Sequence, residues 1–494
     1  MKYLLAALLA GTTSAHAAQS CADLSKFTSA EHQIVIRQVS EEAGRCRVEG
    51  VIDARTGRDG KPYGIGFAVA LPAEWNGRFL FQGGGGLNGS VQPPLGAQYA
   101  GDQPALQRGF AVASTDSGHQ GAVFDGGFLR DQQATLDFLY QGVATVTVIA
   151  KQLVTQRYGK APGHSYFVGC STGGREAMMM SQRFPSYFDG IVAAAPAMRT
   201  SFSNLGLRHA TAALNAVAPV KPDGQRDTRA ALSDADRKLV VDRVLETCDA
   251  LDGNRDGFIF APQDCRFDPA VLTCKGGRKN GCLTRGQVSA IRTVMRGPRT
   301  PSGRQVYPGY YYDTGIANTT GLPGILAGPV IPEGRPVGVS LDVDAAAAEA
   351  MDARAMAGDS NAWTNLSTFR GHGGKLIFLH GVSDPWFSAQ DTVQYYDRLA
   401  QDNADEPLGN WSRLFLVPGM GHCGGGARTL DRVDLLDALV DWVEAGRAPD
   451  RVIATGASAP GESRPLCPYP AHAQYTGAGD AHDAANYSCR KPDR

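Results

Sequence analysis

Short apolar runs and amphipathic stretches alternate along most of the chain. An apolar run closed by glycine, proline or polar residues is typical of a buried strand, and apolar residues that recur every three to four positions are typical of a helix. This pattern predicts strands at residues 34–39, 46–52, 65–71, 78–82, 110–114, 166–168, 191–195, 375–380 and 413–417, and helices at 133–158, 175–183, 390–400 and 433–445. Strands that alternate with helices of this length favour an α/β fold with a mostly parallel sheet.

The alternation stops near residue 198 and resumes after residue 370. The segment between them contains four cysteines, an acidic loop and stretches rich in glycine, proline and tyrosine. We therefore predict one α/β core in two parts, residues 18–197 and 371–494, with residues 198–370 inserted as a lid. Ligands bind beyond the carboxyl ends of parallel strands, where such a lid would lie.

The composition indicates a folded protein without a nucleic-acid or membrane partner. Of the 494 residues, 43% are hydrophobic and 20% are charged, as in globular proteins. The formal net charge is -1 and no long basic run is present, which argues against nucleic-acid binding and a polybasic membrane anchor. No segment after the N-terminus offers the roughly 18 consecutive apolar residues of a transmembrane helix.

The N-terminus has the pattern of a cleavable export signal. Lys2 precedes an apolar run at 3–10, and Ala15-His16-Ala17 fits a small-residue cleavage site. We predict residues 1–17 as the signal and a secreted or periplasmic mature chain. Its ten cysteines, an even number, favour disulfides in that compartment. Zinc is the alternative, but no Cys-x-x-Cys or Cys-x-x-His pair is present.

The strand at 166–168 runs directly into Gly169-Cys170-Ser171-Thr172-Gly173, and a helical stretch follows. Gly-x-Ser-x-Gly between a strand and a helix is typical of a nucleophile elbow, a sharp turn that exposes a serine hydroxyl at the top of the sheet. The alternative is a chance match in a chain that contains 60 glycines. A base and an acid at the expected places decide between the two.

In such a fold the acid and then the histidine follow the serine along the chain. Asp384 lies in the loop after the strand at 375–380, and His422 lies in the loop after the strand at 413–417. We predict a catalytic triad in which His422 takes the proton of Ser171 and Asp384 orients the imidazole. His380 is a rival base, but it closes a strand, and we expect it to line the substrate pocket or to form structural hydrogen bonds. Phe387 is expected to line the pocket.

Two cysteines flank the predicted triad: Cys170 precedes the serine and Cys423 follows the histidine. Because Ser171 and His422 must touch in a triad, their neighbours come within disulfide range. We predict a Cys170–Cys423 bridge. The remaining cysteines pair most simply with their neighbours in sequence, each closing a short loop, as Cys21–Cys46, Cys248–Cys265, Cys274–Cys282 and Cys467–Cys489.

The tetrahedral intermediate of such a reaction needs two backbone N–H donors. One is predicted at Thr172, the residue after the nucleophile, and the other in the glycine run at 83–86, at Gly85 or Gly86. A phosphate-binding loop is the rival interpretation of this run. It has neither the Gly-x-Gly-x-x-Gly spacing nor a Walker lysine, so this interpretation is weak.

The Cys-Ser pair at 170–171, Asp384 and the His-Cys pair at 422–423 together resemble the tannase and feruloyl esterase family, whose signature is this triad with a disulfide joining the two cysteines. The resemblance extends over nearly the whole mature chain, including the glycine run and the Arg-Pro-Leu-Cys-Pro at 464–468. It implies an α/β-hydrolase core with a lid, hydrolysis of hydroxycinnamate, gallate or related aromatic esters, and calcium in the lid.

The acidic loop offers a place for that calcium. The resemblance implies that side chains of Asp249, Asp252 and Asp256 and the carbonyls of Asn254 and Phe258 bind a structural Ca²⁺. Hard oxygen ligands at this spacing suit the ion, although no glutamate closes the loop as in an EF-hand. A solvated acidic turn is the alternative.

We expect an exported serine carboxylesterase that cleaves small aromatic esters through an acyl-enzyme. An alternative substrate is a half-ester such as mono(2-hydroxyethyl) terephthalate. An alternative of another class is a non-catalytic, calcium-dependent binding module on a hydrolase fold. The lid segment at 307–312 is not followed by the Gly-Ser-Glu and tryptophan usual in the family, so we expect the lid to set the substrate.

Overall fold

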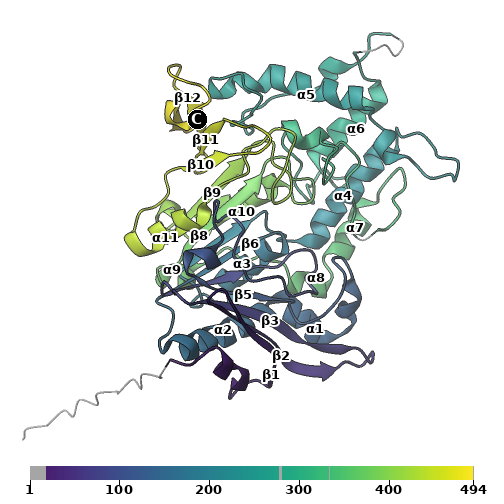
Figure 1. Cartoon of the computed structure of the whole chain (residues 1–494). Coiled ribbons are helices and arrows are strands. Elements are labelled where there is room, and N and C mark those ends of the chain that lie inside the picture. The colour runs from purple at the N-terminus through teal and green to yellow at the C-terminus, as the bar shows by residue number, and fades with distance from the viewer. Residues whose placement is uncertain (1–17, 277–280, 333, 493–494) are drawn as a thin grey trace, which may run out of the picture.

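The structure, a computed structural model, describes residues 18–276, 281–332 and 334–492 (Figure 1). The predicted export signal at 1–17 lies outside the described residues. Among the described helices, none is long and apolar enough to cross a membrane. The five predicted disulfides are confirmed, because all ten cysteines are paired as Cys21–Cys46, Cys170–Cys423, Cys248–Cys265, Cys274–Cys282 and Cys467–Cys489.

A nine-stranded sheet in the order β1-β2-β3-β5-β4-β6-β7-β8-β9 forms the centre of the core. Its strands are β1 (Ile34–Glu42), β2 (Arg45–Thr56), β3 (Pro62–Pro72), β4 (Arg78–Gln82), β5 (Ala111–Thr115), β6 (His164–Cys170), β7 (Gly190–Ala194), β8 (Lys375–Gly381) and β9 (Ser412–Val417). The pairs β1·β2, β2·β3 and β3·β5 are antiparallel. The other five pairs, from β5·β4 to β8·β9, are parallel. The predicted α/β class with a mostly parallel sheet is confirmed.

Alternate residues of the central strands point to opposite faces, and each face has its own helices. Phe167 of β6 packs in a cluster with residues of α2 (Gly142–Tyr158), α3 (Thr172–Arg183) and α10 (Ala389–Asp402). Tyr166 and Val168 pack in the other cluster, with α11 (Leu435–Ala445). The central strands are therefore covered on both faces, which explains why they are largely apolar, whereas the edge strand β1 is polar and partly exposed.

The helix predicted at 133–158 is interrupted near its start. The chain forms α1 (Gln132–Leu136), a π-helical turn at Asp137–Gln141, and only then α2. The guanidinium of Arg175 on α3 donates to the carbonyls of Leu139 and Phe138 at 2.9 and 3.0 Å. A side chain that takes carbonyls from the helical ladder is a common cause of such a widened turn, and apolar periodicity does not reveal it.

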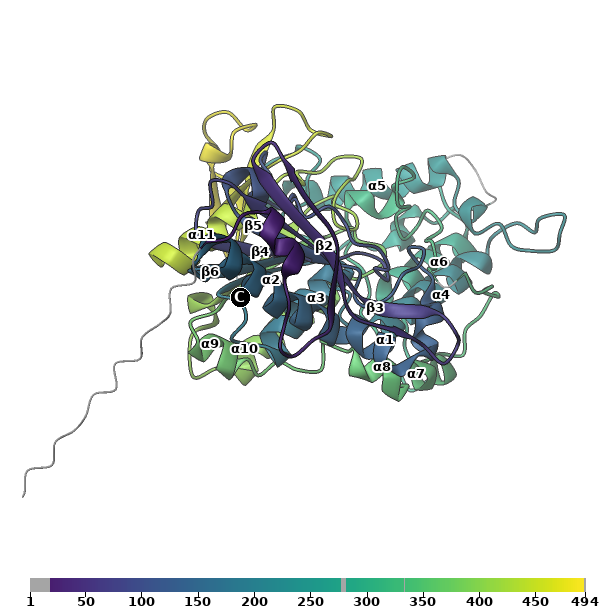
Figure 2. The same cartoon turned by 60° about the horizontal axis from the view of Figure 1, so that its bottom comes forward.

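Between β7 and β8 the chain leaves the sheet and forms a largely helical layer on one side of it (Figure 1). Its helices are α4 (Thr200–Asn215), α5 (Asp234–Cys248), α6 (Arg285–Arg296), α7 (Val343–Ala350) and α8 (Ala353–Ala357), whereas α9 (Ser367–Gly371) lies beside the core, where Phe369 packs in the cluster of Phe167. Leu207, Leu214, Val244 and Ile291 belong to a hydrophobic cluster of this layer. Figures 1 and 2 both place α7 and α8 beside α1 of the core, where the inserted segment meets the sheet layer.

The C-terminal residues form two small antiparallel pairs, β10 (Val452–Thr455) with β11 (Ser463–Leu466) and β12 (His472–Tyr475) with β13 (Tyr487–Arg490). They contact the acidic loop of the inserted segment, because Arg464 forms an ion pair with Asp256 at 2.5 Å. The C-terminal segment therefore contacts the inserted segment.

Candidate active site

Ser171 stands at the junction of β6, which ends at Cys170, and α3, which begins at Thr172. Its backbone is strained, with φ 64° and ψ -121°, in a region that non-glycine residues rarely adopt. A Cβ on Gly169 would lie 2.6 Å from the carbonyl of Gly173, and a Cβ on Gly173 would lie 2.7 Å from the oxygen of Gly84. Both glycines are therefore required, as expected of a nucleophile elbow.

Asp384 and His422 lie in the loops after β8 and β9 and contact one another. His422 Nδ1 is 2.7 Å from Asp384 Oδ2, and Asp384 Oδ1 accepts the backbone N–H groups of Trp386 and Phe387 at 2.8 and 3.0 Å. Burial by itself would raise the pKa of Asp384, but the attraction of His422 and hydrogen bonds from both nearby histidines hold it well below the usual range. The ionised carboxylate favours a proton on Nδ1 and leaves Nε2 of His422 available as a base.

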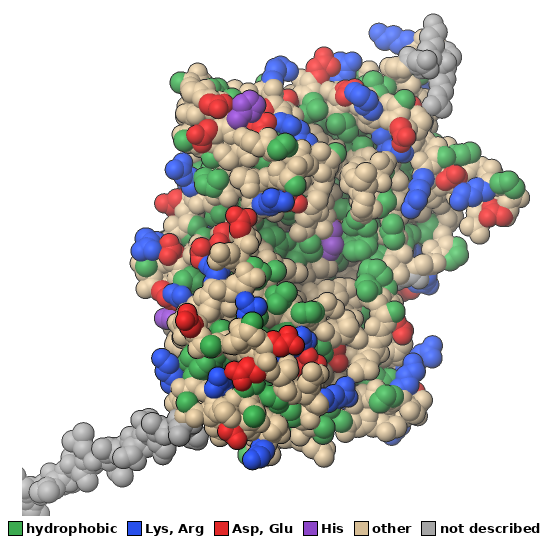
Figure 3. Space-filling view, viewed as in Figure 1, with side chains coloured by type: hydrophobic (Ala, Val, Ile, Leu, Met, Phe, Trp, Pro, Cys, Tyr) green, Lys and Arg blue, Asp and Glu red, His purple; other side chains and the backbone are tan. Residues whose placement is uncertain are grey.

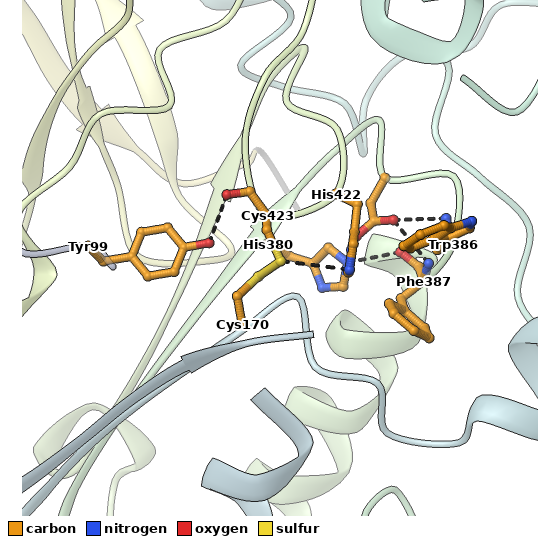
Figure 4. The surroundings of a disulfide bond; sticks show 8 residues. Tyr99, Cys170, His380, Trp386, Phe387, His422 and Cys423 are labelled. Atoms are coloured by element: carbon orange, nitrogen blue, oxygen red, sulfur yellow. Dashed lines mark hydrogen bonds and ion pairs between the residues drawn. A yellow bond between two sulfur atoms is a disulfide. The ribbon is translucent and has the colours of Figure 1, made fainter. Parts of the chain in front are cut away.

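The base and the nucleophile are joined through the Cys170–Cys423 disulfide, whose Cα atoms are 5.9 Å apart (Figure 4). His422 Nε2 lies 3.7 Å from Cys423 Sγ, and within the described residues no hydrogen bond joins it to the Ser171 hydroxyl. Catalytic hydrogen bonds are often long before substrate binds and tighten in the reacting complex. The hydroxyl of Tyr99 donates to the Cys423 carbonyl at 3.1 Å and holds this loop from the opposite side.

Of the two roles expected for His380, the structure shows the structural one, because this residue does not line the cavity. Its side chain is fully buried, with Nδ1 2.9 Å from Thr392 Oγ1 and Nε2 2.9 Å from the Phe387 carbonyl (Figure 4). The same Nε2 is 3.4 Å from Asp384 Oδ2. Because His380 ends a strand whose side chains alternate between the two faces, its ring turns into the core and supports the acid rather than the substrate.

Of the four glycines at 83–86, two have backbone N–H groups that are already in use. Gly83 donates to the Val168 carbonyl and Gly84 to the Glu176 carboxylate, each at 2.9 Å. Within the described part of the chain, the N–H groups of Gly85 and Gly86 donate to no protein acceptor. Only Gly86 of this pair lines the cavity with Ser171 and Thr172, which favours Gly86 over Gly85 as the second donor.

A cavity of about 840 Å³ lies between the sheet layer and the inserted helices and reaches Ser171. Figure 3 shows hydrophobic side chains gathered around a hollow at the centre of this face. Trp386 and Phe387 line the cavity, and both rings lie 5.1 Å from the imidazole of His422. Phe124, from the loop after β5, meets Trp386 edge-on at 5.8 Å. Two aromatic side chains of one loop therefore lie beside the base, and Phe124 of a second loop packs against one of them.

Sequence reasoning missed Phe124 and Phe138, which both line this cavity. The loop at 116–131 follows a strand at the carboxyl edge of the sheet, and this position was the available signal. Trp363, an aromatic of the lid segment, is 59% exposed and lies outside the cavity lining. Position along the strands thus indicates a pocket residue better than aromatic character does.

The acidic loop is held by its own hydrogen bonds and by distant segments. Asp249 and Asp252 are buried, and burial raises the pKa of Asp252 to about 8. Asp256 instead turns to Arg464, and Asn254 donates to Asp256 Oδ2 at 2.9 Å. Among the described residues, no three acidic, histidine or cysteine side chains converge as a metal centre. The carboxylates and carbonyls of this loop are nevertheless hard oxygen donors of the type that Ca²⁺ prefers.

The acidic loop is distant from the predicted triad in sequence but adjoins its base loop in space. Arg428, six residues after His422, donates from Nε to the carbonyl of Asp256 at 2.8 Å. Its guanidinium also lies 4.5 Å from the centre of the Phe258 ring. The loop that carries the base is therefore anchored on the acidic loop.

Comparisons with known proteins agree with this geometry. A sequence model of the tannase and feruloyl esterase family matches residues 46–331 and 338–490. The chain is 39% identical to the mono(2-hydroxyethyl) terephthalate hydrolase of Piscinibacter sakaiensis over 517 residues, covering 90% of this chain and 85% of that protein. It is 31% identical to feruloyl esterase B of Aspergillus niger over 449 residues, covering 85% of this chain and 82% of that protein.

Two solved structures share the fold over almost the entire chain. The crystal structure of feruloyl esterase B from Aspergillus oryzae matches with a TM-score of 0.77 at 27% identity, covering 95% of this chain and 99% of that one. A tannin acyl hydrolase from Aspergillus niger matches with a TM-score of 0.68 at 21% identity, covering 93% and 90%. At 21% identity, the match to the tannin acyl hydrolase shows a shared fold alone.

Proposed function

This chain belongs to the tannase and feruloyl esterase family and is a carboxylic ester hydrolase, and we propose that it cleaves aromatic esters through an acyl-enzyme on Ser171. One observation carries the proposal. The strained elbow serine is linked through the Cys170–Cys423 bond to the loop of His422, and His422 is bonded to the buried Asp384. The relatives named for feruloyl and terephthalate esters support the aromatic acyl group.

In the proposed reaction, His422 Nε2 takes the proton of Ser171 as its oxygen attacks the ester carbonyl carbon. The carbonyl oxygen becomes an oxyanion that accepts hydrogen bonds from the N–H groups of Thr172 and Gly86. His422 then gives its proton to the departing alcohol, which leaves Ser171 acylated. The same base next activates water, and attack of that water releases the carboxylic acid and restores the serine.

The aromatic residues beside His422 support an aromatic acyl group. Phe387, Trp386 and Phe124 offer edges and faces against which a planar ring packs, and such contacts are worth about 0.5–1.5 kcal/mol beyond the buried area. The likeness to the terephthalate half-ester hydrolase favours a second candidate, an acyl group with a free carboxylate. Arg208 and Arg335 lie on the cavity wall, where both form ion pairs with Glu349, at 3.2 and 2.6 Å. The binding-module alternative has no support, since the relatives are named hydrolases and esterases.

The substitution Ser171→Ala tests the triad. We expect it to abolish hydrolysis of methyl ferulate while the thermal unfolding curve stays unchanged. A serine-reactive phosphonate should label one site per wild-type chain and no site in the variant. Retention of most activity by the variant would contradict the assignment. Rates on methyl ferulate, methyl gallate and mono(2-hydroxyethyl) terephthalate then separate the acyl groups.

We further propose that the acidic loop binds a structural Ca²⁺ through Asp249, Asp252 and Asp256 with the carbonyls of Asn254 and Phe258. The clustering of three carboxylates within eight residues, two of them buried, supports this proposal. A bound ion would neutralise their repulsion and tighten a loop on which the base loop rests. Chelation should lower Tm, and added Ca²⁺ should restore it. Asp252→Asn should remove this response, and Asp242→Asn, an exposed acid of α5, should keep it.

We propose that the mature chain acts outside the cytoplasm. The five disulfides support this location, because such bonds persist in oxidising compartments. The export pattern at residues 1–17 agrees with it. Mass spectrometry of the protein recovered from a bacterial periplasm or culture medium should find an N-terminus at Ala18, and a full-length chain retained in the cytoplasm would contradict the proposal.

A further inference from the structure

The glycine run at 83–86 is attached to α3, the helix after the elbow, through the backbone N–H and carbonyl of Gly84. The N–H of Gly84 donates to Glu176 Oε2 at 2.9 Å, and the carbonyl of Gly84 accepts the N–H of Gly173 at 3.0 Å. Glu176 and Gly173 both belong to α3, the helix that begins at Thr172. The Thr172 hydroxyl also donates to the carbonyl of Gly86. The loop with the second oxyanion donor is thus attached directly to the helix with the first.

Glu176 is fully buried and accepts three hydrogen bonds from two separate loops. Its Oε2 takes the Gly84 N–H, and its Oε1 takes Asn88 Nδ2 at 2.7 Å and the Ser117 hydroxyl at 3.0 Å. Asn88 closes the glycine loop by donating its own N–H to the Gly85 carbonyl at 2.9 Å. One carboxylate therefore ties the loop after β4 and the loop after β5 to α3.

We propose that Glu176 is a positioning residue that sets the distance between the two oxyanion donors, Thr172 N–H and Gly86 N–H. This inference rests on the proposed function, because it assigns those two groups to the oxyanion. Glu176 touches no reacting atom. It acts through Gly84, which lies two residues before Gly86, and through Asn88, which lies two residues after it.

A carboxylate suits this role better than a neutral side chain. Burial raises the pKa of Glu176, and the hydrogen bonds from Gly84, Asn88 and Ser117 act against that shift. In the ionised form the two oxygens accept the three donors without offering a hydrogen of their own, and such hydrogen bonds are stronger than neutral ones. A glutamine would present one acceptor oxygen and an NH₂ group, so either Gly84 or the Asn88–Ser117 pair would face a donor. The neighbouring Arg175 does not take the carboxylate, because its guanidinium donates to the Leu139 and Phe138 carbonyls.

Displacement of an oxyanion donor should destabilise the transition state. Oxyanion donors stabilise charge only when they are held in place before the reaction, and loss of one such donor costs about 10²–10³ in kcat in other serine hydrolases. A Gly86 N–H group that is displaced but still present should lower kcat by a smaller factor. Substrate binding, which relies on the aromatic wall, should change little.

The test compares wild type with Glu176→Gln on methyl ferulate. We expect kcat to fall by about 10- to 100-fold, while KM changes by less than about threefold. Phenylboronic acid, which forms a tetrahedral adduct on a reactive serine, should lose affinity by a similar factor, and the product ferulate should bind as before. An unchanged kcat, or equal losses of affinity for ferulate and the boronic acid, would overturn the inference.

Ser181→Ala is the matched control, because Ser181 is another buried polar residue of α3 whose hydroxyl, among the described residues, donates to the Met178 carbonyl alone. It should leave kcat unchanged. If Glu176→Gln folds poorly, Ser117→Ala removes one donor to the same carboxylate and should give a smaller loss in kcat with the same selective loss of boronic acid binding. Failure of wild type to hydrolyse the ester or to label at Ser171 would instead refute the proposed function itself.

Discussion

Cys170 and Cys423 are 253 positions apart in the chain, yet they form a disulfide with Cα atoms 5.9 Å apart. Cys170 is the last residue of β6, and Cys423 lies in the glycine-rich loop after β9 with a positive φ of 60°. The bond fixes the loop of the base against the nucleophile turn. The two loops are therefore held together by a covalent link as well as by packing.

Replacing both cysteines, as Cys170→Ala with Cys423→Ala, should reduce kcat by about 100-fold, because misplacement of a base by about 1 Å has that effect. Circular dichroism should show an intact fold. Replacement of Cys467 and Cys489, which close a C-terminal loop, provides the control: it should lower the free energy of unfolding by about 2–4 kcal/mol and spare kcat below Tm. Full activity of the first variant would show that packing alone aligns the base.

Phe124→Ala should raise KM for methyl ferulate by roughly two- to tenfold, the loss expected for one aromatic contact. The corresponding acetate ester, whose acyl group does not reach the Phe124–Trp386 pair, should be hydrolysed with unchanged KM. Trp363→Ala removes an exposed aromatic outside the cavity and should change neither value. Equal effects of Phe124→Ala on both esters would move the acyl ring elsewhere in the cavity.

Asp313 of the inserted segment is fully buried and binds both catalytic loops. Its Oδ2 accepts the Ser383 hydroxyl at 2.6 Å and the Gly419 N–H at 2.7 Å. Asp313→Ala would leave these two donors unsatisfied, which should cost about 1–3 kcal/mol for each buried group. We expect a lower Tm and a lower kcat at temperatures where the variant is folded.

The control for Asp313 is Asp268→Ala, an exposed acid of the same segment that pairs with Arg292. It should change Tm little, since exposed ion pairs contribute at most about 1 kcal/mol. A variant of Asp313 with reduced Tm and an undiminished kcat would show that the acid and base loops keep their geometry without this carboxylate.

Glu444 on α11 should make stability depend on pH in the acid range. It accepts Arg78 Nε and Nη2 at 2.7 and 2.8 Å and the Tyr166 hydroxyl at 2.7 Å. The hydrogen bonds from Arg78 lower its pKa to about 2, against the opposing effect of burial. A lowered pKa means that the ionised form is stabilised by folding. The contribution is therefore complete above the usual glutamate pKa of about 4 and is lost as pH falls toward 2.

Thermal unfolding of wild type and Glu444→Gln between pH 7 and pH 3 measures this contribution. The difference in Tm should be greatest near neutral pH and should shrink below pH 4. A difference that stays constant over this range would mean that Glu444 stabilises the protein by packing and not by charge.

Much of the fold could be predicted because its signals are local. Apolar runs such as 375–380 and 413–417 have a length and composition typical of buried strands, and the end of the strand-helix alternation marks the start of the inserted segment. The helix at 133–158 shows the limit. Its interruption depends on Arg175, a residue of another helix, and no periodicity within 133–158 carries that information.

The sequence by itself determined the class of chemistry, because the elbow pattern, the order of Ser171, Asp384 and His422, and the cysteines beside them are features of short segments. Only the tertiary structure decided that His380 supports the acid instead of the pocket, that Phe124 meets Trp386, and that Glu176 holds the glycine loop. Each of these contacts joins side chains from different segments. These contacts form only when strand alternation, loop conformation and helix packing act together, and a single stretch of sequence does not contain that combination.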